Sequence, residues 1–191
     1  MLPPNLDTIE QLFTQHGSGA YHGEAVSQLE HALQAAWAAE REGQSVEVVA
    51  AALLHDIGHM LADAGELAHL EGRNDFHEEA GANWLRLLFP PSVTEPVRLH
   101  VEAKRYLVAT DPVYAAKLSP ASIQSLELQG GPMSAAECEA FRQNPHFQSA
   151  VALRHGDEAA KIPGLRTPDF AHFRRYLTGL IRPQPPAGTI A

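Results

Sequence analysis

The sequence predicts an all-α protein that folds as a single domain. Apolar residues recur at steps of three and four along most of the chain, which is the period of an amphipathic helix. No stretch of four or more residues alternates cleanly between apolar and polar side chains with turn residues at its ends, as a strand would. The length of 191 residues suits one domain with one core, because domains average roughly 150 residues.

Four helices are expected in the first 110 residues, over residues 24–42, 45–60, 75–88 and 94–108. Ser45 stands where an N-cap is expected, at the start of an almost wholly apolar segment that suits the centre of a bundle. Asp75 and Glu78 have the spacing of a capping box. Pro96 falls in the first turn of a helix that opens at Thr94.

Capping signals predict the remaining elements. Ser119 and Pro120 begin a short helix that ends at the Gly130–Gly131 pair. Ser134 caps the next helix, and a further helix is expected over residues 145–160. A last amphipathic helix begins at 167–168. We expect residues 1–20 to form a lead-in, 21–182 the functional domain, and 183–191 a loose tail.

The charge balance limits the partners that the protein can have. There are 14 Lys and Arg against 23 Asp and Glu, so the formal charge is 14 − 23 = −9, and there are 11 histidines. An acidic chain lacks the continuous basic face that nucleic acid or an anionic membrane requires. The single cysteine, Cys138, cannot form an internal disulfide, and neither a signal peptide nor a membrane span is evident, so we expect a cytoplasmic protein.

Histidines and aspartates interrupt the apolar pattern of the first two helices. His31 lies off the apolar stripe of its helix and shares a second face with Glu24 and Gln28. His55 and His59 are neighbours at a four-residue step in an otherwise apolar helix. Burying such groups without partners would cost several kcal/mol each. A metal site or a dense hydrogen-bond network is therefore expected.

The order His31, His55–Asp56, Asp157 resembles the ligand order H…HD…D of the HD-domain superfamily, a helical metal-binding fold. Five longer strings, YHGEAVSQLEHALQ, AALLHDIGH, AKRYLV, SPASIQSLELQGGPM and RHGDE, resemble the HD-domain mixed-valent diiron oxygenases, and most closely the members that cleave carbon–phosphorus bonds. The resemblance implies an HD-domain helical bundle over 21–182. It also implies two iron ions, Fe(II) and Fe(III), with O2 as cosubstrate. Four imidazoles and two carboxylates suit iron or another first-row transition metal.

The resemblance assigns the site residues. It implies that one iron is held by His31, His55, Asp56 and Asp157. His77 and His100 would hold the second iron, with Asp56 bridging the two. The second iron has fewer protein ligands, so substrate and O2 are expected there.

Cationic residues stand one helical turn from several of these ligands. His59 is four residues after His55, Lys104 four after His100, and Arg154 three before Asp157. The resemblance independently gives phosphonate-binding roles to these three residues and to Ser122 and Ser125. It further implies that Tyr21 acts as a lid on the second iron and that Glu24 binds the amine of the substrate. Tyr21, Glu24, His59 and Lys104 form the expected catalytic set.

The function so implied is oxidative cleavage of a 1-hydroxy-2-aminoethylphosphonate-type substrate to inorganic phosphate and glycine. A hydroxylase that makes the hydroxyphosphonate is the expected functional partner. Three alternatives stay open: the N-trimethylated substrate giving glycine betaine, a metal-dependent phosphohydrolase, and a non-catalytic iron or oxygen sensor. The QGGPM loop has no assigned role beyond a tight turn. Six histidines are expected to have ordinary structural roles: His16, His22, His69, His146, His155 and His172.

Overall fold

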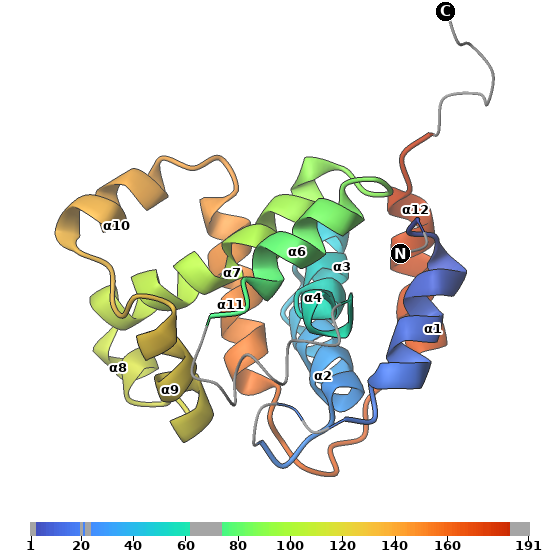
Figure 1. Cartoon of the computed structure of the whole chain (residues 1–191), viewed down its shortest axis with the longest axis horizontal. Helices are drawn as coiled ribbons and strands as arrows, with labels where there is room; N and C mark the ends of the chain where they lie inside the picture. Colours follow the sequence, from blue (N-terminus) through green and yellow to red (C-terminus); the bar gives the residue numbers. More distant parts are fainter. Residues whose placement is uncertain (1–2, 20, 22–23, 62–73, 184–191) are drawn as a thin grey trace, which may run out of the picture.

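The computed structural model describes residues 3–19, 21, 24–61 and 74–183 and confirms the all-α fold within them. Figure 1 shows the helices gathered into one bundle with no β-strand in this part of the chain. In chain order the helices are α1 (Leu6–His16), α2 (Gln28–Arg41), α3 (Val46–Leu54), α4 (Ile57–Leu61), α6 (His77–Leu85), α7 (Pro91–Thr110), α8 (Pro112–Ala115), α9 (Pro120–Leu128), α10 (Ala135–Arg142), α11 (Phe147–Ala159) and α12 (Phe170–Leu180).

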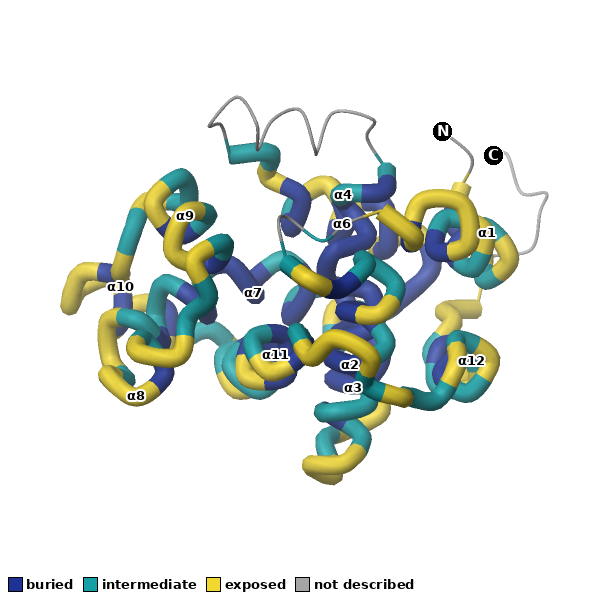
Figure 2. The backbone as a smooth tube through the Cα atoms, turned by 90° about the horizontal axis from the view of Figure 1, so that it is seen from below, coloured by how far each residue is buried: buried dark blue, intermediate teal, exposed yellow. Residues whose placement is uncertain are grey.

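Helix α3 is the centre of the bundle and packs against α2, α7 and α11. Every residue from 48 to 54 is buried, as the apolar character of this segment predicts. The small side chains of Ala50, Ala51 and Ala52 allow the neighbouring helices to approach closely. In Figure 2 the buried segments gather in the middle of the molecule, and the exposed segments lie toward its outside. None of the helices in the described ranges is long and apolar enough to span a bilayer.

Helix α1 forms where the sequence analysis expected only a lead-in. The side chain of Asn5 caps it by accepting a hydrogen bond from the backbone of Thr8. Ile9 and Phe13 are buried in the main core, and the Phe13 ring contacts Phe170 of α12 at 5.4 Å between centroids. The N-terminal segment is therefore part of the folded core. Of the expected tail, residues 184–191 lie outside the described residues.

The expected continuous helix over 45–60 is wrong, because it breaks at the His55–Asp56 pair. Ser45 caps α3 as predicted, α3 ends at Leu54, and a separate short helix, α4, begins at Ile57. At Gly58 the chain passes directly over α6, since a Cβ atom there would lie 2.0 Å from the carbonyl oxygen of His77. The break and this close approach bring α4 against α6.

The predicted starts of the next two helices are also wrong. Asp75 is not the N-cap of α6, because Phe76 occupies that position in a left-handed conformation with φ of 52°. The side chain of Asp75 instead contacts the imidazole of His77. Helix α7 begins at Pro91, one turn before Thr94, because Pro91 is itself a favourable first residue. Pro96 consequently lies inside the helix.

Helices α8, α9 and α10 extend one side of the bundle. The N-cap of α9 at Ser119 and the capping box of α10 at Ser134 are both confirmed. A second, smaller core of mainly apolar side chains lies beneath α10: Leu99, Ala103, Met133, Cys138, Phe141 and Ala150. The QGGPM loop is fastened to α7, because the side chain of Arg105 donates a hydrogen bond of 2.9 Å to the carbonyl of Gly131. The loop thus holds the end of α9 at a fixed distance from α7.

Candidate metal centre and substrate pocket

The first cluster of potential ligands joins α2, α11 and the break after α3. His31 Nε2 lies 3.1 Å from His55 Nε2 and 3.3 Å from Asp157 Oδ1. His55 Nε2 lies 3.7 Å from Asp157 Oδ2. All three side chains are almost fully buried. These atoms are close enough together to bind one metal ion.

The second cluster joins α6 and α7. His77 Nε2 lies 3.1 Å from His100 Nε2. Both rings are buried, and they tilt toward each other with centroids 5.1 Å apart. With one carboxylate oxygen of Asp56, the two nitrogens form another group able to hold a metal ion.

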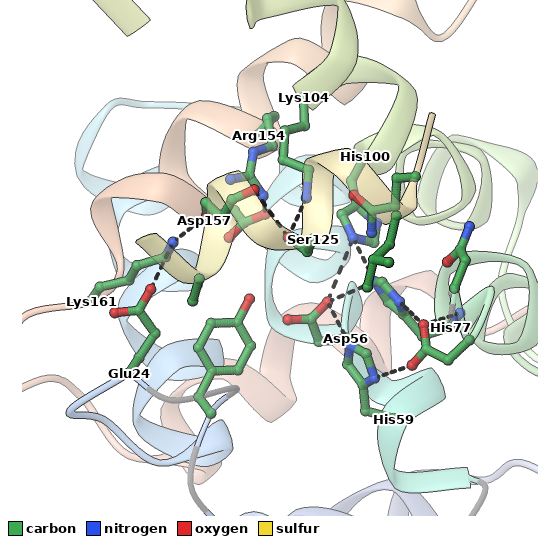
Figure 3. A pocket seen from close by; sticks show the side chains of 17 residues that line it. Glu24, Asp56, His59, His77, His100, Lys104, Ser125, Arg154, Asp157 and Lys161 are labelled. Atoms are coloured by element: carbon green, nitrogen blue, oxygen red, sulfur yellow. Dashed lines mark hydrogen bonds and ion pairs between the residues drawn. The ribbon is translucent and has the colours of Figure 1, made fainter. Parts of the chain in front are cut away.

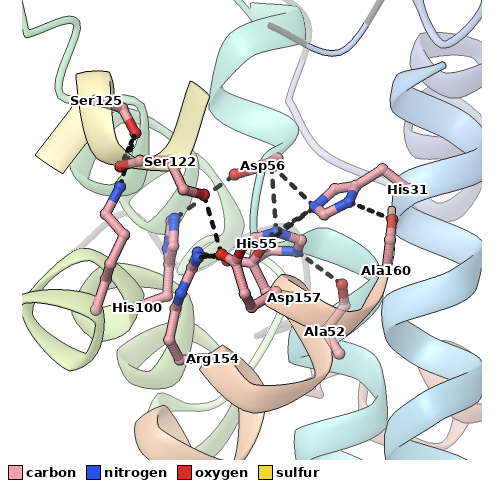
Figure 4. Close-up of polar contacts among 12 residues, drawn as sticks. His31, Ala52, His55, Asp56, His100, Ser122, Ser125, Arg154, Asp157 and Ala160 are labelled. Carbon is pink, nitrogen blue, oxygen red and sulfur yellow. Dashed lines mark hydrogen bonds and ion pairs between the residues drawn. The ribbon is translucent and has the colours of Figure 1, made fainter. Parts of the chain in front are cut away.

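Asp56 connects the two clusters through its two carboxylate oxygens. Oδ2 faces the first cluster, 3.2 Å from His55 Nε2 and 3.6 Å from His31 Nε2. Oδ1 faces the second, 3.4 Å from His77 Nε2 and 3.5 Å from His100 Nε2. Figure 4 shows this carboxylate in contact with the cluster around His31 and His55. One carboxylate therefore faces both groups of potential metal ligands.

Hydrogen bonds at Nδ1 orient all four imidazoles. His31 donates to the carbonyl of Ala160 (2.9 Å), His55 to that of Ala52 (2.8 Å) and His100 to that of Val97 (2.7 Å). His77 donates to the carboxylate of Asp75 at 2.8 Å. With its proton on Nδ1, a neutral imidazole presents the lone pair of Nε2, and these outer contacts are characteristic of metal-binding histidines.

The polar atoms at the centre of this arrangement fit metal ions. Asp56 Oδ2 and Asp157 Oδ1 are buried, and neither has a hydrogen-bond partner among the described residues. Burial alone would raise the pKa of Asp56, but the nearby imidazoles, His55 foremost, hold it well below its usual value. Burial likewise lowers the pKa of His55, yet Asp56 and Asp157 raise it to about 9. The centre therefore attracts positive charge, and a nitrogen and oxygen donor set suits a first-row transition metal.

Asp75 is a functional candidate that the sequence analysis missed. Its Oδ1 accepts from His77, and its Oδ2 lies 2.7 Å from His59 Nδ1. The rings of His59 and His77 stack with centroids 3.8 Å apart. One carboxylate therefore positions both a potential ligand and a predicted substrate-binding residue. The capping-box spacing of Asp75 concealed this role, since a cap and an outer ligand partner require the same residue type.

A pocket lies against the metal centre and brings the predicted substrate-binding residues together (Figure 3). Its lining includes Tyr21, Glu24, His59, Lys104, Ser122, Ser125 and Arg154, which were all predicted, and Asn74, Asp75, Gln129 and Lys161, which were not. The pocket also contacts Asp56, His77, His100 and Asp157. His31 and His55 lie behind these residues and do not line it.

Lys104 presents a buried cation to this pocket. Its ammonium donates a hydrogen bond of 2.9 Å to Ser125 Oγ, its one hydrogen-bond partner in the described part of the chain. Two of its three N–H donors are thus available to an anion. Burial, with the charge of Arg154 nearby, lowers the pKa of Lys104 to about 7. An anionic ligand would return this side chain to its charged form.

Arg154 has more hydrogen-bond and ion-pair partners than Lys104 in the described part of the chain. Its guanidinium forms ion pairs with Asp157 and Glu158, and its Nε donates to the hydroxyl of Tyr114 at 2.6 Å. The side chain is buried. Arg154 therefore holds Asp157 in place while it lines the pocket, a positioning role that its three-residue spacing from Asp157 did not reveal.

The two serines of α9 already use their hydroxyl protons. Ser122 Oγ donates to Glu158 Oε2 at 3.0 Å, and Ser125 Oγ donates to the carbonyl of Ser122 at 3.1 Å. Either hydroxyl would have to rotate before it could donate to a substrate. Their predicted role as phosphonate donors stays a prediction.

Tyr21 and Glu24 enter the site from the segment before α2. Glu24 therefore does not share a helix face with His31, as the sequence analysis expected, because α2 begins only at Gln28. The ring of Tyr21 stacks on the imidazole of His31 with centroids 3.9 Å apart. Burial and the carboxylates of Asp56 and Asp157 raise the pKa of Tyr21 well above its usual value, so its phenol stays protonated.

The histidines without an assigned role lie away from this site where the structure describes them. His172 contacts Glu40 at 3.0 Å, and His16 and His155 are exposed. His146 stands at the N-cap position of α11. His22 and His69 lie outside the described residues.

Comparison with known proteins agrees with this architecture. Residues 28–129 match the HD domain family, a range that includes His31, His55–Asp56, His77 and His100 and ends before Asp157. The chain is 46% identical over 168 residues to 1-hydroxy-2-(trimethylamino)ethyl phosphonate dioxygenase (glycine-betaine-forming) of Leisingera caerulea, covering 88% of this chain and 86% of the relative.

Two further relatives cover most of the chain. The hydroxymethylphosphonate dioxygenase of Gimesia maris is 46% identical over 164 residues, which is 85% of this chain and 81% of the relative. An uncharacterised protein of Acanthamoeba polyphaga mimivirus is 37% identical over 162 residues, 83% of this chain and 73% of the relative. The similarity therefore extends well beyond the HD motif.

Proposed function

The chain belongs to the HD-domain family, and the two phosphonate dioxygenases are among its relatives. We propose that it is an oxygenase that cleaves the carbon–phosphorus bond of a 1-hydroxyalkylphosphonate. The observation that carries the proposal is the position of Asp56 between two ligand clusters, beside a pocket that contains the buried cation Lys104. A sensor with the same helices would not require a cationic pocket next to a second ligand cluster. A two-metal phosphohydrolase would use both features, so its distinction from the oxygenase rests on the phosphonate dioxygenase relatives and on the need for O2.

We propose that the centre holds two iron ions in the mixed-valent Fe(II)/Fe(III) state. His31, His55 and Asp157 would hold one, His77 and His100 the other, and Asp56 would bridge them. The donor set supports iron, and the orphaned oxygens of Asp56 and Asp157 support a cation at this place. When bound, the irons supply the electron transfer to O2 that the protein's own side chains do not provide.

The second ion would have fewer protein ligands than the first, because two imidazoles and one carboxylate oxygen face it. Substrate and O2 would reach this ion from the pocket, which His77, His100 and Asp56 line. The ammonium of Lys104 would then neutralise the phosphonate as a point charge, and His59 borders the same part of the pocket. Arg154 would donate from those guanidinium N–H groups that its ion pairs do not use. Tyr21, on the segment before α2, would cover the metal centre.

The finer substrate assignment concerns the group on the hydroxyl-bearing carbon. We propose 2-amino-1-hydroxyethylphosphonate, because Glu24 lines the pocket and a carboxylate binds a primary ammonium through charge-assisted hydrogen bonds. With O2, this substrate gives glycine and inorganic phosphate, and the atoms balance without a further reactant. The N-trimethylated substrate, giving glycine betaine, is supported equally by the relative from Leisingera caerulea. A hydroxylase would supply either substrate.

The experiment is an anaerobic reconstitution with ferrous iron followed by addition of each candidate substrate, with and without O2. We expect phosphate together with glycine or glycine betaine only when O2 is admitted. The variant Asp56→Asn should lose activity, whereas Asp111→Asn, at a half-buried N-cap where Asn also caps, should keep it. Equal phosphate release under nitrogen with manganese or cobalt would instead establish a phosphohydrolase. Tight iron binding without turnover of any substrate would favour the sensor.

A further inference from the structure

A network of polar side chains closes the pocket on the side opposite His59 and His77 (Figure 3). We call it the Lys161 network, and it comprises Glu24, Ser119, Ser122, Glu158 and Lys161. Its members come from the segment before α2, from the start of α9 and from the end of α11. Lys161 belongs to no motif in the sequence, yet its ammonium is the point at which the network converges.

The contacts of Lys161 fix its ammonium beside Glu24. Nζ lies 2.7 Å from Ser122 Oγ, 3.1 Å from Ser119 Oγ and 3.1 Å from Glu158 Oε1. It also lies 3.3 Å from Glu24 Oε1. The side chain is only 11% exposed, so these interactions are largely shielded from water. Lys161 is therefore a fixed charge in the pocket wall.

Only one of the two carboxylate oxygens of Glu24 is consequently engaged by described residues. Its Oε1 accepts a hydrogen bond of 2.5 Å from Ser119 Oγ and faces Lys161. No described residue hydrogen-bonds to its other oxygen, Oε2. A ligand that reaches Glu24 thus meets one available carboxylate oxygen and, next to it, a positive charge. Glu158, beside it, pairs with both Lys161 and Arg154.

We propose that Lys161 is a specificity-determining residue, which weakens the attraction of Glu24 for a cationic group on the substrate and so sets the preference between ammonium-bearing and uncharged 1-hydroxyphosphonates. The proposal rests on the proposed function. An ammonium bound to Glu24 is repelled by Lys161 at short range, whereas an uncharged substituent is not. A primary ammonium is still accepted, because it has N–H groups to donate to Oε2. A trimethylammonium has none.

The test compares two probes that share the hydroxyphosphonate group, 2-amino-1-hydroxyethylphosphonate and hydroxymethylphosphonate. Their Kd values are measured by calorimetry on iron-loaded enzyme without O2, and their kcat/KM values by phosphate release in air. The ratio of the two Kd values cancels the attraction of the phosphonate for Lys161, which both probes feel. In Lys161→Met we expect the ratio to shift toward the amine by about tenfold or more.

Three controls separate charge from fold. Lys161→Arg keeps the charge and should keep the ratio within about threefold of the parent value. Lys117→Met removes the same charge from an exposed position and should leave the ratio unchanged. Lys161→Gln keeps polar contacts to the serines and should behave as Lys161→Met does, which covers the case in which the methionine variant fails to fold.

An unchanged ratio, or a shift toward the uncharged probe, in a neutral variant that melts at the parent temperature would overturn the proposal. Either result would show that the charge of Lys161 does not weaken the attraction of Glu24 for a cationic group on the substrate. If the parent enzyme neither binds nor turns over either probe, the proposed function itself fails, and this inference fails with it. The two failures are therefore distinguishable.

Discussion

Asp75→Asn tests whether the carboxylate behind His59 and His77 supports the second metal position. In the parent protein Oδ1 accepts from His77 Nδ1 at 2.8 Å, and Oδ2 lies 2.7 Å from His59 Nδ1. Asparagine has the same shape, but one of its two terminal atoms is an N–H donor. One of the two imidazoles must then lose its acceptor, or its tautomer must change and with it the nitrogen that faces the metal.

The expected loss can be estimated from the number of partners. Removing an outer hydrogen-bond partner of a metal-binding histidine lowers metal affinity by roughly 10- to 100-fold. This corresponds to about 1.4 to 2.7 kcal/mol. His77 should lie near the upper value, because Asp75 also brings a negative charge to a buried position. The first metal position should be unaffected, since His31 and His55 donate to backbone carbonyls instead.

The assay is an anaerobic titration of the metal-free protein with ferrous iron. In Asp75→Asn the second equivalent should bind roughly 10- to 100-fold more weakly while the first keeps the parent affinity. Asp111→Asn is the matched control, since it removes the same charge at the half-buried N-cap of α8. Equal weakening of both equivalents would point to a general loss of structure, and unchanged binding of the second would refute the assigned role of Asp75.

Three further predictions follow from the geometry. Gly58→Ala should lower the free energy of unfolding in urea by about 1–3 kcal/mol and weaken binding of the second iron ion, because the new methyl group meets the carbonyl of His77. Unchanged iron binding would contradict this. Substrate Kd should rise as the pH increases through about 7, because Lys104, whose pKa is about 7, loses its proton and with it the attraction for the phosphonate. Lys104→Arg, which stays charged, should abolish that rise. Chelation of the metal should lower the free energy of unfolding by about 2.7 kcal/mol relative to protein kept at a free iron concentration of 100 times the iron Kd. The loss would be seen as a fall in Tm of about 2–4 °C per kcal/mol. Equal Tm values would argue against a bound metal.

The parts of the fold that sequence predicts well are those determined by neighbouring residues. Ser45, Ser119 and Ser134 cap helices as expected, because an N-cap hydrogen bond connects residues two or three apart. His31, His55 and Asp56 stand out in the sequence for a related reason, because ionisable side chains interrupt otherwise apolar helices. The family resemblance supplied His77, His100 and Asp157 as further potential ligands, and the structure brings all six side chains close together.

The parts that sequence does not predict depend on contacts between distant segments. Asp75 and Glu78 have capping-box spacing, but the interaction of Asp75 with His59 and His77 replaces the cap. Phe76 adopts a left-handed conformation that disfavours residues other than glycine, and no local pattern announces it. In the sequence Lys161 looks like any lysine near a helix end, and only its contacts with the start of α9 in the structure distinguish it. A residue whose role is set by tertiary contacts leaves no periodic signal.

The break between α3 and α4 best explains how one dipeptide serves two metal positions. The expected helix over 45–60 would have continued through the pair, and consecutive side chains of a helix point about 100° apart. In the structure the regular helix stops at Leu54, His55 Nε2 and Asp56 Oδ2 converge to 3.2 Å, and Oδ1 of the same aspartate faces the second cluster. Gly58 then lets α4 pass over His77, which brings α6 close enough for its histidine to face Asp56. The motif thus depends on the glycine that follows it as well as on its own two residues, because without the close approach at Gly58 the second cluster would lie too far from the bridging carboxylate.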